Sequence, residues 1–149
     1  MLLAEIGDTP YNIILFLHVV AMFVAFAPAF VHPFLNAQTS DYPNRPQIWE
    51  AIAVRGQRIY GSALIIGGLL GFGVAGMSDS AISVSDSWVW PAVVLWVAMN
   101  GVLHAMIVPG ERAIGEGDES KVRNVEIGGV VITLLFLVSM YLMVFKPGA

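Results

Sequence analysis

The sequence contains no cysteine. This absence excludes disulfide bonds, thiolate metal sites and iron–sulfur clusters held by the chain itself. Charged residues make up only 12% of the chain, which is about half of their usual share in soluble domains. The formal net charge is −4 and no basic face offsets it, so nucleic-acid binding is not expected. The sequence also lacks a GxSxG elbow, an HExxH pair and a phosphate-binding loop, so nothing in it suggests a hydrolase.

Hydrophobic residues, in contrast, make up 57% of the chain. Four windows without Lys, Arg or Asp approach or exceed the roughly 20 residues that a helix needs to cross a bilayer: 11–36, 59–77, 88–108 and 126–145. The sequence therefore predicts an all-α fold, an integral membrane four-helix bundle that forms a single domain over residues 1–149, with the lipid bilayer as its surroundings.

The basic residues indicate how this bundle is oriented. Two long connecting segments contain nearly all of them: Arg45, Arg55 and Arg58 in the first, and Arg112, Lys121 and Arg123 in the second. In the N-terminal tail and in residues 78–87, all of the charged residues are acidic. The positive-inside rule then predicts a multi-pass protein of the cytoplasmic (inner) membrane with both termini outside. Because the first ten residues include no basic n-region, we expect no cleaved signal peptide.

The connecting segments and the first span have features of their own. The stretch IWEAIAVRGQR, residues 48–58, is either a short interfacial helix or an extension of the second span. The stretch GERAIGEGDESKVR, residues 110–123, is expected to be a polar, flexible loop. Pro28 and Pro33 are expected to kink the long first span, since proline removes a backbone donor.

Small residues recur every four positions along the second predicted span: Ala63, Gly67, Gly71 and Ala75. In lipid, such a ridge lets helix backbones approach closely. We expect it to contact another helix, either within the bundle or in a homo-oligomer or larger membrane complex formed through Gly67 and Gly71.

The three histidines are the main candidates for chemistry: His18, His32 and His104. The predicted topology places His18 in the outer half of the membrane, and the other two at similar depth near the cytoplasmic side. Trp96, Asn100 and His104 share one helix face, which we expect to point inward because lipid cannot satisfy polar groups. His32 and His104 are therefore expected to approach one another, with Asn100 and Glu126 nearby.

Three interpretations of this cluster stay open. In the first, the histidines simply hydrogen-bond to backbone or interfacial water. Alternatively, His32 and His104 are the axial ligands of a b-type haem whose propionates meet Arg55 or Arg58. In a third interpretation, His32, His104 and Glu126 hold a non-haem metal ion, since two histidines and a carboxylate suit iron, zinc or manganese.

His18 raises a separate question. A haem in the outer half would need a second ligand at that depth, and Met140 or Met143 on the last span is a candidate for a weak axial ligand. Otherwise His18 hydrogen-bonds across helices to Asn, Ser or Tyr groups, and the two methionines are packing residues.

Two stretches carry a resemblance to a known family. YNIILFLHVVAMFVAFAPAFVHPFL resembles the first span of a family of small bacterial integral membrane proteins, and the glycine-rich RIYGSALIIGGLLGFGVAG agrees in character. That family is distantly similar to the copper-resistance-D membrane domain and to the haem-containing, oxygen-independent protoporphyrinogen IX oxidase. The resemblance covers the first half of the chain and implies that His18 carries haem, as an early histidine does in the oxidase. This chain lacks the arginine beside Pro28 and the lysine inside a span that the oxidase uses, so the resemblance supports the fold more than catalysis.

These observations lead to one main hypothesis for function, a haem-associated redox or electron-transfer protein in the membrane. A non-catalytic accessory subunit of a larger membrane complex is the alternative. A small transporter is a further one, which the Pro28 kink permits although the paired broken helices typical of transporters are missing. The sequence does not decide whether the protein is an enzyme.

Overall fold

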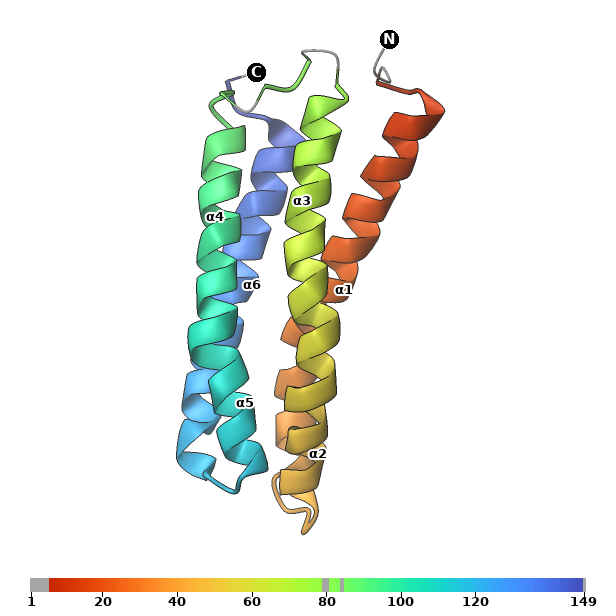
Figure 1. Ribbon diagram of the computed structural model, residues 1–149. Helices are drawn as coiled ribbons and strands as arrows, with labels where there is room; N and C mark the ends of the chain where they lie inside the picture. Colours follow the sequence, from red (N-terminus) through yellow and green to blue (C-terminus); the bar gives the residue numbers. More distant parts are fainter. Residues whose placement is uncertain (1–5, 79–80, 84, 149) are drawn as a thin grey trace.

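The computed structural model describes residues 6–78, 81–83 and 85–148, and all regular structure in these ranges is helical. Four rods lie side by side, and α1 begins at the same end of the bundle at which α6 ends (Figure 1). The elements in chain order are α1 (Thr9–Thr39), α2 (Arg45–Ala51), the π-helix η1 (Ile52–Gly61), α3 (Ser62–Gly76), α4 (Val89–Val102), the π-helix η2 (Leu103–Ile107), α5 (Val108–Gly115), the 3₁₀-helix η3 (Glu119–Lys121) and α6 (Val122–Phe145).

Consecutive elements join into four rods that are long and apolar enough to cross a membrane: Thr9–Thr39, Arg45–Gly76, Val89–Gly115 and Glu119–Phe145. The first and last predicted windows lie inside the corresponding rods. The second and third lie inside theirs except for one residue at one end. The outer surfaces of the rods are apolar, as a lipid environment requires. Phe23 of α1, for example, is 77% exposed. The expected all-α, four-span architecture is thus confirmed.

The structure decides between the alternatives for the first connecting segment and corrects the expectation for the second. Residues 48–58 lie within the continuous second rod, so they extend the second span. Residues 110–123 were expected to form a flexible loop, and this expectation is wrong for most of them, since α5 continues to Gly115 and η3 begins at Glu119. The reason is packing. Ile114 is buried, and a side chain on Gly115 would lie 2.9 Å from the backbone of Glu50, so this part of the third rod fits closely against the second.

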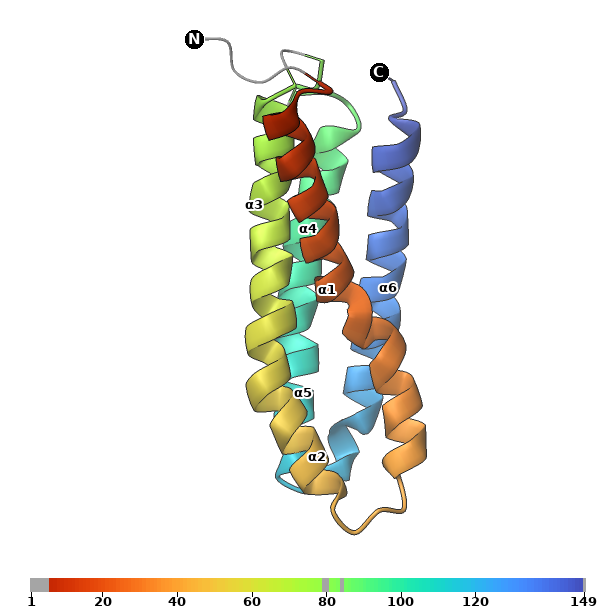
Figure 2. The same cartoon turned by 90° about the vertical axis from the view of Figure 1, so that its right-hand side faces the viewer.

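α1 changes partner along its length. It starts beside α3 and, past its middle, bends toward α6 (Figure 2). Pro28 and Pro33 lie inside the helix and each lacks the N–H that would bond to the preceding turn, which is the expected cause of such a bend. Just before the bend, the ring of Phe26 stacks on Phe136 of α6 with centroids 3.9 Å apart.

The small-residue ridge faces α1. A Cβ atom on Gly67 would lie 3.0 Å from the sulfur of Met22, and one on Gly71 would lie 3.1 Å from Cε1 of His18. The expected helix contact is therefore made within the chain. An oligomer or larger complex formed through these two glycines would have to displace α1.

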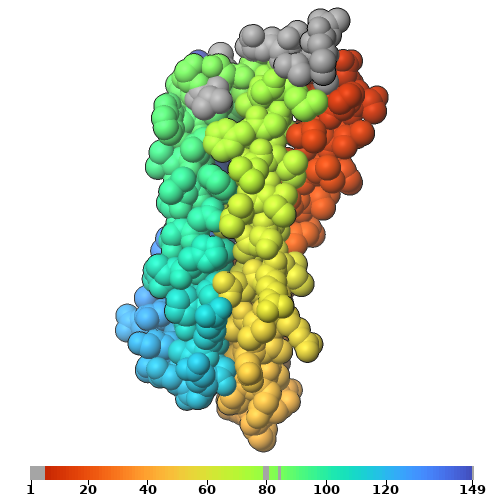
Figure 3. Space-filling model, in the orientation of Figure 1, coloured from red at the N-terminus to blue at the C-terminus, as the bar shows by residue number. Residues whose placement is uncertain are grey.

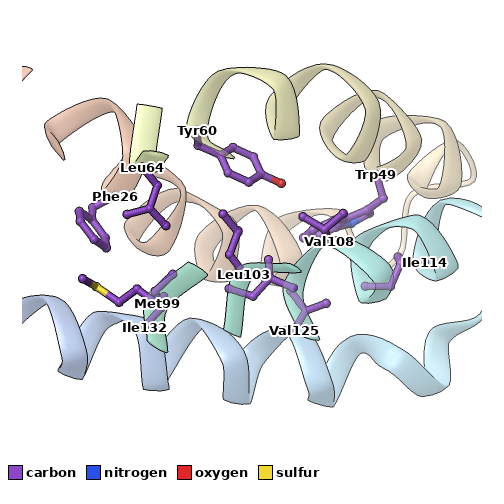
Figure 4. Close-up of a cluster of buried hydrophobic side chains, with 11 residues drawn as sticks. Phe26, Trp49, Tyr60, Leu64, Met99, Leu103, Val108, Ile114, Val125 and Ile132 are labelled. Atoms are coloured by element: carbon purple, nitrogen blue, oxygen red, sulfur yellow. The ribbon is translucent and has the colours of Figure 1, made fainter. Parts of the chain in front are cut away.

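The buried apolar core occupies the half of the bundle that contains the two π-helices, and all four rods contribute to it (Figure 4). The third rod supplies an inward stripe in which Met99, Leu103 and Ile107 are all buried. This stripe sets the rotation of the third rod and decides where its polar residues point.

Candidate functional site

A fully buried carboxylate lies in one half of the bundle. We call this the inner half; it contains the connection between rods one and two and the connection between rods three and four. Glu111 of α5 is 0% exposed. The hydroxyl of Tyr60, from η1, donates a hydrogen bond to its Oε2, and Nδ1 of His32, from α1, lies 2.8 Å from its Oε1. Three rods thus place three titratable side chains in contact. Ionisable groups within membrane spans are costly, and their presence is by default a hypothesis of function.

Aromatic rings enclose this group. The ring of His32 meets those of Trp49 and Tyr60 edge-on, with centroids 5.8 Å and 5.9 Å apart. Among the described residues, the buried Trp49 Nε1 has no hydrogen-bond partner, and Glu111 Oε1 receives no aligned hydrogen bond although His32 is close.

A small cavity adjoins the cluster. It has a volume of about 50 Å³, and His32, Trp49 and Tyr60 form part of its wall together with apolar residues of α1, η2 and α6. We call it the inner cavity. The π-helices η1 and η2 both border it, through Tyr60 on one side and Leu103 and Ile107 on the other. π-Helical turns are rare and are found frequently at functional sites.

Polar pairs lie at the membrane-surface end of the inner cavity. Asn36, which is part of the cavity wall, donates a hydrogen bond of 2.8 Å to the exposed Glu126 of α6. The buried Arg45 donates to both carboxylate oxygens of Glu119, at 2.8 Å and 3.1 Å, and to Oδ1 of Asn36 at 2.6 Å. These bonds tie together the ends of the first, second and fourth rods.

His104 does not belong to this cluster, and the expected approach of His32 and His104 is not found. His104 is exposed and lines a groove of about 700 Å³ between the second and third rods, together with Arg58 and Arg112. Figure 3 shows the face on which these two rods lie side by side. The residue that points inward is its neighbour Leu103, and one residue along a helix is a rotation of about 100°.

The other residues of that expected face are only half-buried. Trp96 Nε1 donates to the carbonyl of Leu64 at 2.8 Å, and the Asn100 amide donates to the carbonyl of Trp96 at 2.9 Å, so Asn100 satisfies its own helix and does not reach the cluster. Trp96 thus contacts α3 within the bundle, as expected, whereas the expected inward position is wrong for His104, because its neighbour Leu103 is the residue that faces the core.

The predicted metal set is not assembled either. Among the residues that the structure describes, no three His, Asp or Glu side chains are placed to hold a metal ion together. Of the arginines expected near a haem at His32, Arg55 is exposed and Arg58 lines the groove beside His104, so neither forms part of the inner cavity.

His18 occupies a different place, in the half of the bundle where α1 begins. The residue is 8% exposed, and its Nδ1 lies 2.7 Å from the backbone carbonyl oxygen of Gly67. In the part of the chain that the structure describes, no hydrogen bond to its Nε2 is found. A predicted hydrogen bond to Asn, Ser or Tyr side chains is thus replaced by one to a helix carbonyl.

His18 lines a second, larger cavity of about 420 Å³, which we call the outer cavity. Its wall is mainly apolar and aromatic and comes from all four rods; Tyr11, Phe72, Trp88, Trp96, Met140 and Met143 contribute to it. Lys146, just past the end of α6, also lines it, with its Nζ 5.6 Å from the centre of the Trp88 ring. The volume falls within the range of about 300–1,000 Å³ that is typical of small-molecule sites.

Glu111, Tyr60 and Trp49 were not predicted as site residues. A signal for the first of them is present in the sequence, because Ile107, Glu111 and Ile114 follow the i, i+4, i+7 spacing of one helix face, on which the two isoleucines are buried. The charge-rich composition around Glu111 is typical of a loop, and for this reason the helical spacing was not predicted.

Comparison with known proteins adds no further identification. No protein-family model matches the chain, and no curated protein or solved structure is significantly similar to it.

Proposed function

We propose that this protein is a membrane haem protein with a redox or electron-transfer role, and that His18 is an axial ligand. The observation that carries the proposal is the position of His18, which is held by a backbone carbonyl at the wall of a large apolar cavity. A haem between His32 and His104, one of the interpretations that the sequence leaves open, is not supported by the positions of these two residues.

The residues around the outer cavity fit a haem in several respects. If His18 Nδ1 donates its proton to the Gly67 carbonyl, Nε2 retains its lone pair and can bind iron, which is the usual arrangement of metal-bound histidines. Gly71 leaves the His18 ring room, since a Cβ atom there would press on it. Met140 or Met143 of α6 would also hold the iron, and Lys146 would pair with a propionate.

Haem iron supplies reversible one-electron transfer when it is bound. The contributions of the chain are to hold and orient the ligand ring through Gly67, and to surround the site with apolar side chains that exclude water. The Gly67 contact also makes the imidazole a stronger ligand, because the carbonyl attracts the Nδ1 proton.

An absorption spectrum tests the proposal. The protein purified in detergent from cells with ample haem is expected to show a Soret band that shifts on reduction with dithionite. A colourless protein that still fails to bind added haemin would contradict the proposal and favour the accessory-subunit alternative. Nothing in the described structure specifically favours that alternative or a transporter.

The orientation in the cytoplasmic membrane is part of the same proposal. We expect Lys121 and Arg123 to face the cytoplasm and Asp86 to face outward, because the basic residues gather at one end of the bundle. Asp79, also expected to face outward, lies outside the described residues. In this cysteine-free chain, Lys121→Cys and Asp86→Cys are labelled with an impermeant thiol reagent in intact cells. Labelling at 86 alone is expected, and labelling at 121 alone would reverse the orientation.

A further inference from the structure

We propose that Glu111 is a proton-binding site that exchanges its proton with the aqueous phase beside Glu126, through His32 and water in the inner cavity. The site lies apart from the outer cavity, so this inference does not depend on haem being bound. It concerns a group that is fully buried in a membrane-spanning rod, where a permanent unpaired charge would be strongly unfavourable.

The contacts of Glu111 suit a carboxyl group that gains and loses a proton. When it is ionised, the Tyr60 hydroxyl donates to Oε2 and a protonated His32 compensates the charge at Oε1. When it is protonated, Oε1 can donate to Nδ1 of a neutral His32 across the same 2.8 Å contact. Transfer of the proton between these two side chains leaves the pair neutral, and the net charge of the pair changes only when it exchanges a proton with water.

His32 connects Glu111 with the inner cavity. The cavity wall includes His32 and Tyr60 but not Glu111 itself, so a proton arriving from the cavity must cross one of these side chains. Imidazole suits this role because it has two nitrogens. When Glu111 is ionised and His32 is neutral with its one proton on Nδ1, a cavity water gives a proton to Nε2, forming an N–H bond. At the same time the Nδ1–H bond breaks and its proton passes to Glu111 Oε1, forming an O–H bond. The water regains a proton from the aqueous side, and no electron is transferred.

The inner cavity is large enough to hold water. A volume of about 50 Å³ exceeds the roughly 30 Å³ that one water molecule occupies in the liquid. Trp49 and His32 both line the cavity, so a water molecule inside it is the group proposed to exchange protons with the imidazole.

The cavity continues toward the surface at Asn36 and Glu126, both of which line it. The exposed carboxylate of Glu126 can collect protons from the aqueous phase, and it accepts a hydrogen bond from Asn36 at this end of the cavity. The charged and titratable groups near this end of the elements around Glu111 are His32 on α1, Arg45 and Glu50 on α2, Arg55, Arg58 and Tyr60 on η1, His104 on η2, Arg112 on α5 itself, Glu119 and Lys121 on η3, and Arg123 and Glu126 on α6. Glu50, Arg55, Arg58, Lys121 and Arg123 are exposed. Of the remaining groups, Arg45 is paired with Glu119, Arg112 donates to Gln57, and His104 lines the separate groove.

Infrared spectroscopy of the full chain in lipid nanodiscs tests this assignment. The carbonyl stretch of a protonated carboxyl group is separate from the bands of ionised carboxylates, and its frequency is higher for a buried carboxyl group than for a solvated one. We expect a component of the buried kind, apart from the components of the exposed Asp and Glu side chains, to rise and fall with pH. Glu111→Gln should remove it, whereas Glu116→Gln, which changes an exposed carboxylate on the same side of the bundle, should leave it unchanged. A component of the buried kind that persists in Glu111→Gln, or no titrating component of this kind in the unmodified protein, would overturn the proposal.

The relay is tested separately by transfer into D₂O. The isotope shift of the Glu111 band reports proton exchange, and His32→Asn should slow it by about a hundredfold, the lower end of what a positioned proton-transfer group contributes. His104→Asn is the matched control and should exchange at the original rate. Equal rates in His32→Asn and the unmodified protein would overturn the relay. This experiment also stands if Glu111→Gln fails to fold, because the isotope-sensitive band is then followed in the His32 variant alone.

Discussion

Replacing His18 with alanine is expected to abolish the Soret absorbance of the haem-loaded protein. The change removes the only histidine that the structure places at the outer cavity, and methionine alone is a weak ligand for haem iron. The measurement is the absorption spectrum together with the amount of haem per chain after affinity purification. His104→Ala is the control, because His104 is exposed in a groove elsewhere and its loss should leave the spectrum unchanged.

The opposite result would be equally informative. If His104→Ala removed the band and His18→Ala kept it, a site involving the His104 groove would replace the outer cavity. A change of Met140 or Met143 to leucine should shift the reduced spectrum in one of the two variants, since only one sulfur can be the second ligand. Unchanged spectra in both would exclude methionine ligation.

The second large effect is expected at Gly68. Even a Cβ atom at this position would overlap the indole of Trp96, whose Nε1 donates to the Leu64 carbonyl at 2.8 Å. Gly68→Ala must therefore push Trp96 out of its place and break this hydrogen bond, and Gly68→Leu must do so more severely. Overpacking alone typically costs about 1–3 kcal/mol, and the lost hydrogen bond of a half-buried donor adds about 1 kcal/mol.

Denaturation in detergent, followed by circular dichroism, measures this loss of stability. Gly101→Ala is the matched control, because a Cβ atom on Gly101 of the neighbouring rod would have no neighbour within 4 Å. Ala favours helix over Gly by about 1 kcal/mol, so the control should be unchanged or stabilised. Equal stability of Gly68→Ala and the unmodified protein would show that α3 and α4 do not pack as the structure has them.

The gross architecture was predictable because hydrophobic windows of this length have one physical solution in a bilayer. Residues 11–36 and 126–145 have too few polar side chains to be anything other than spans, and their helices were found where the windows lie. The close helix contact at the glycine ridge could also be predicted, since the absence of side chains at Gly67 and Gly71 lets another helix approach. The partner in this contact could not be predicted, because α1, another rod or a second copy of the chain would fit against the ridge equally well.

The sites depended on finer information. Depth along a helix follows from counting residues, and it placed His32 and His104 at comparable levels. Whether two residues meet depends also on how each helix is rotated about its axis. A rotation by one residue position decides whether His104 or Leu103 faces the core. The π-helix η2 begins at this position, and a π-turn has a different residue period from the α-helix assumed by the i, i+4 spacing.

By itself, then, the sequence determined that this protein has four apolar helices, no thiol chemistry and three histidines, because composition and window length do not depend on how the helices are arranged. Only the tertiary structure decided that His32 meets Glu111 and Tyr60, and that His18 meets Gly67 beside an apolar cavity. These contacts join residues on different rods. They are set by the rotation and close approach of whole helices, which depend on the sum of many small packing interactions and not on any local pattern.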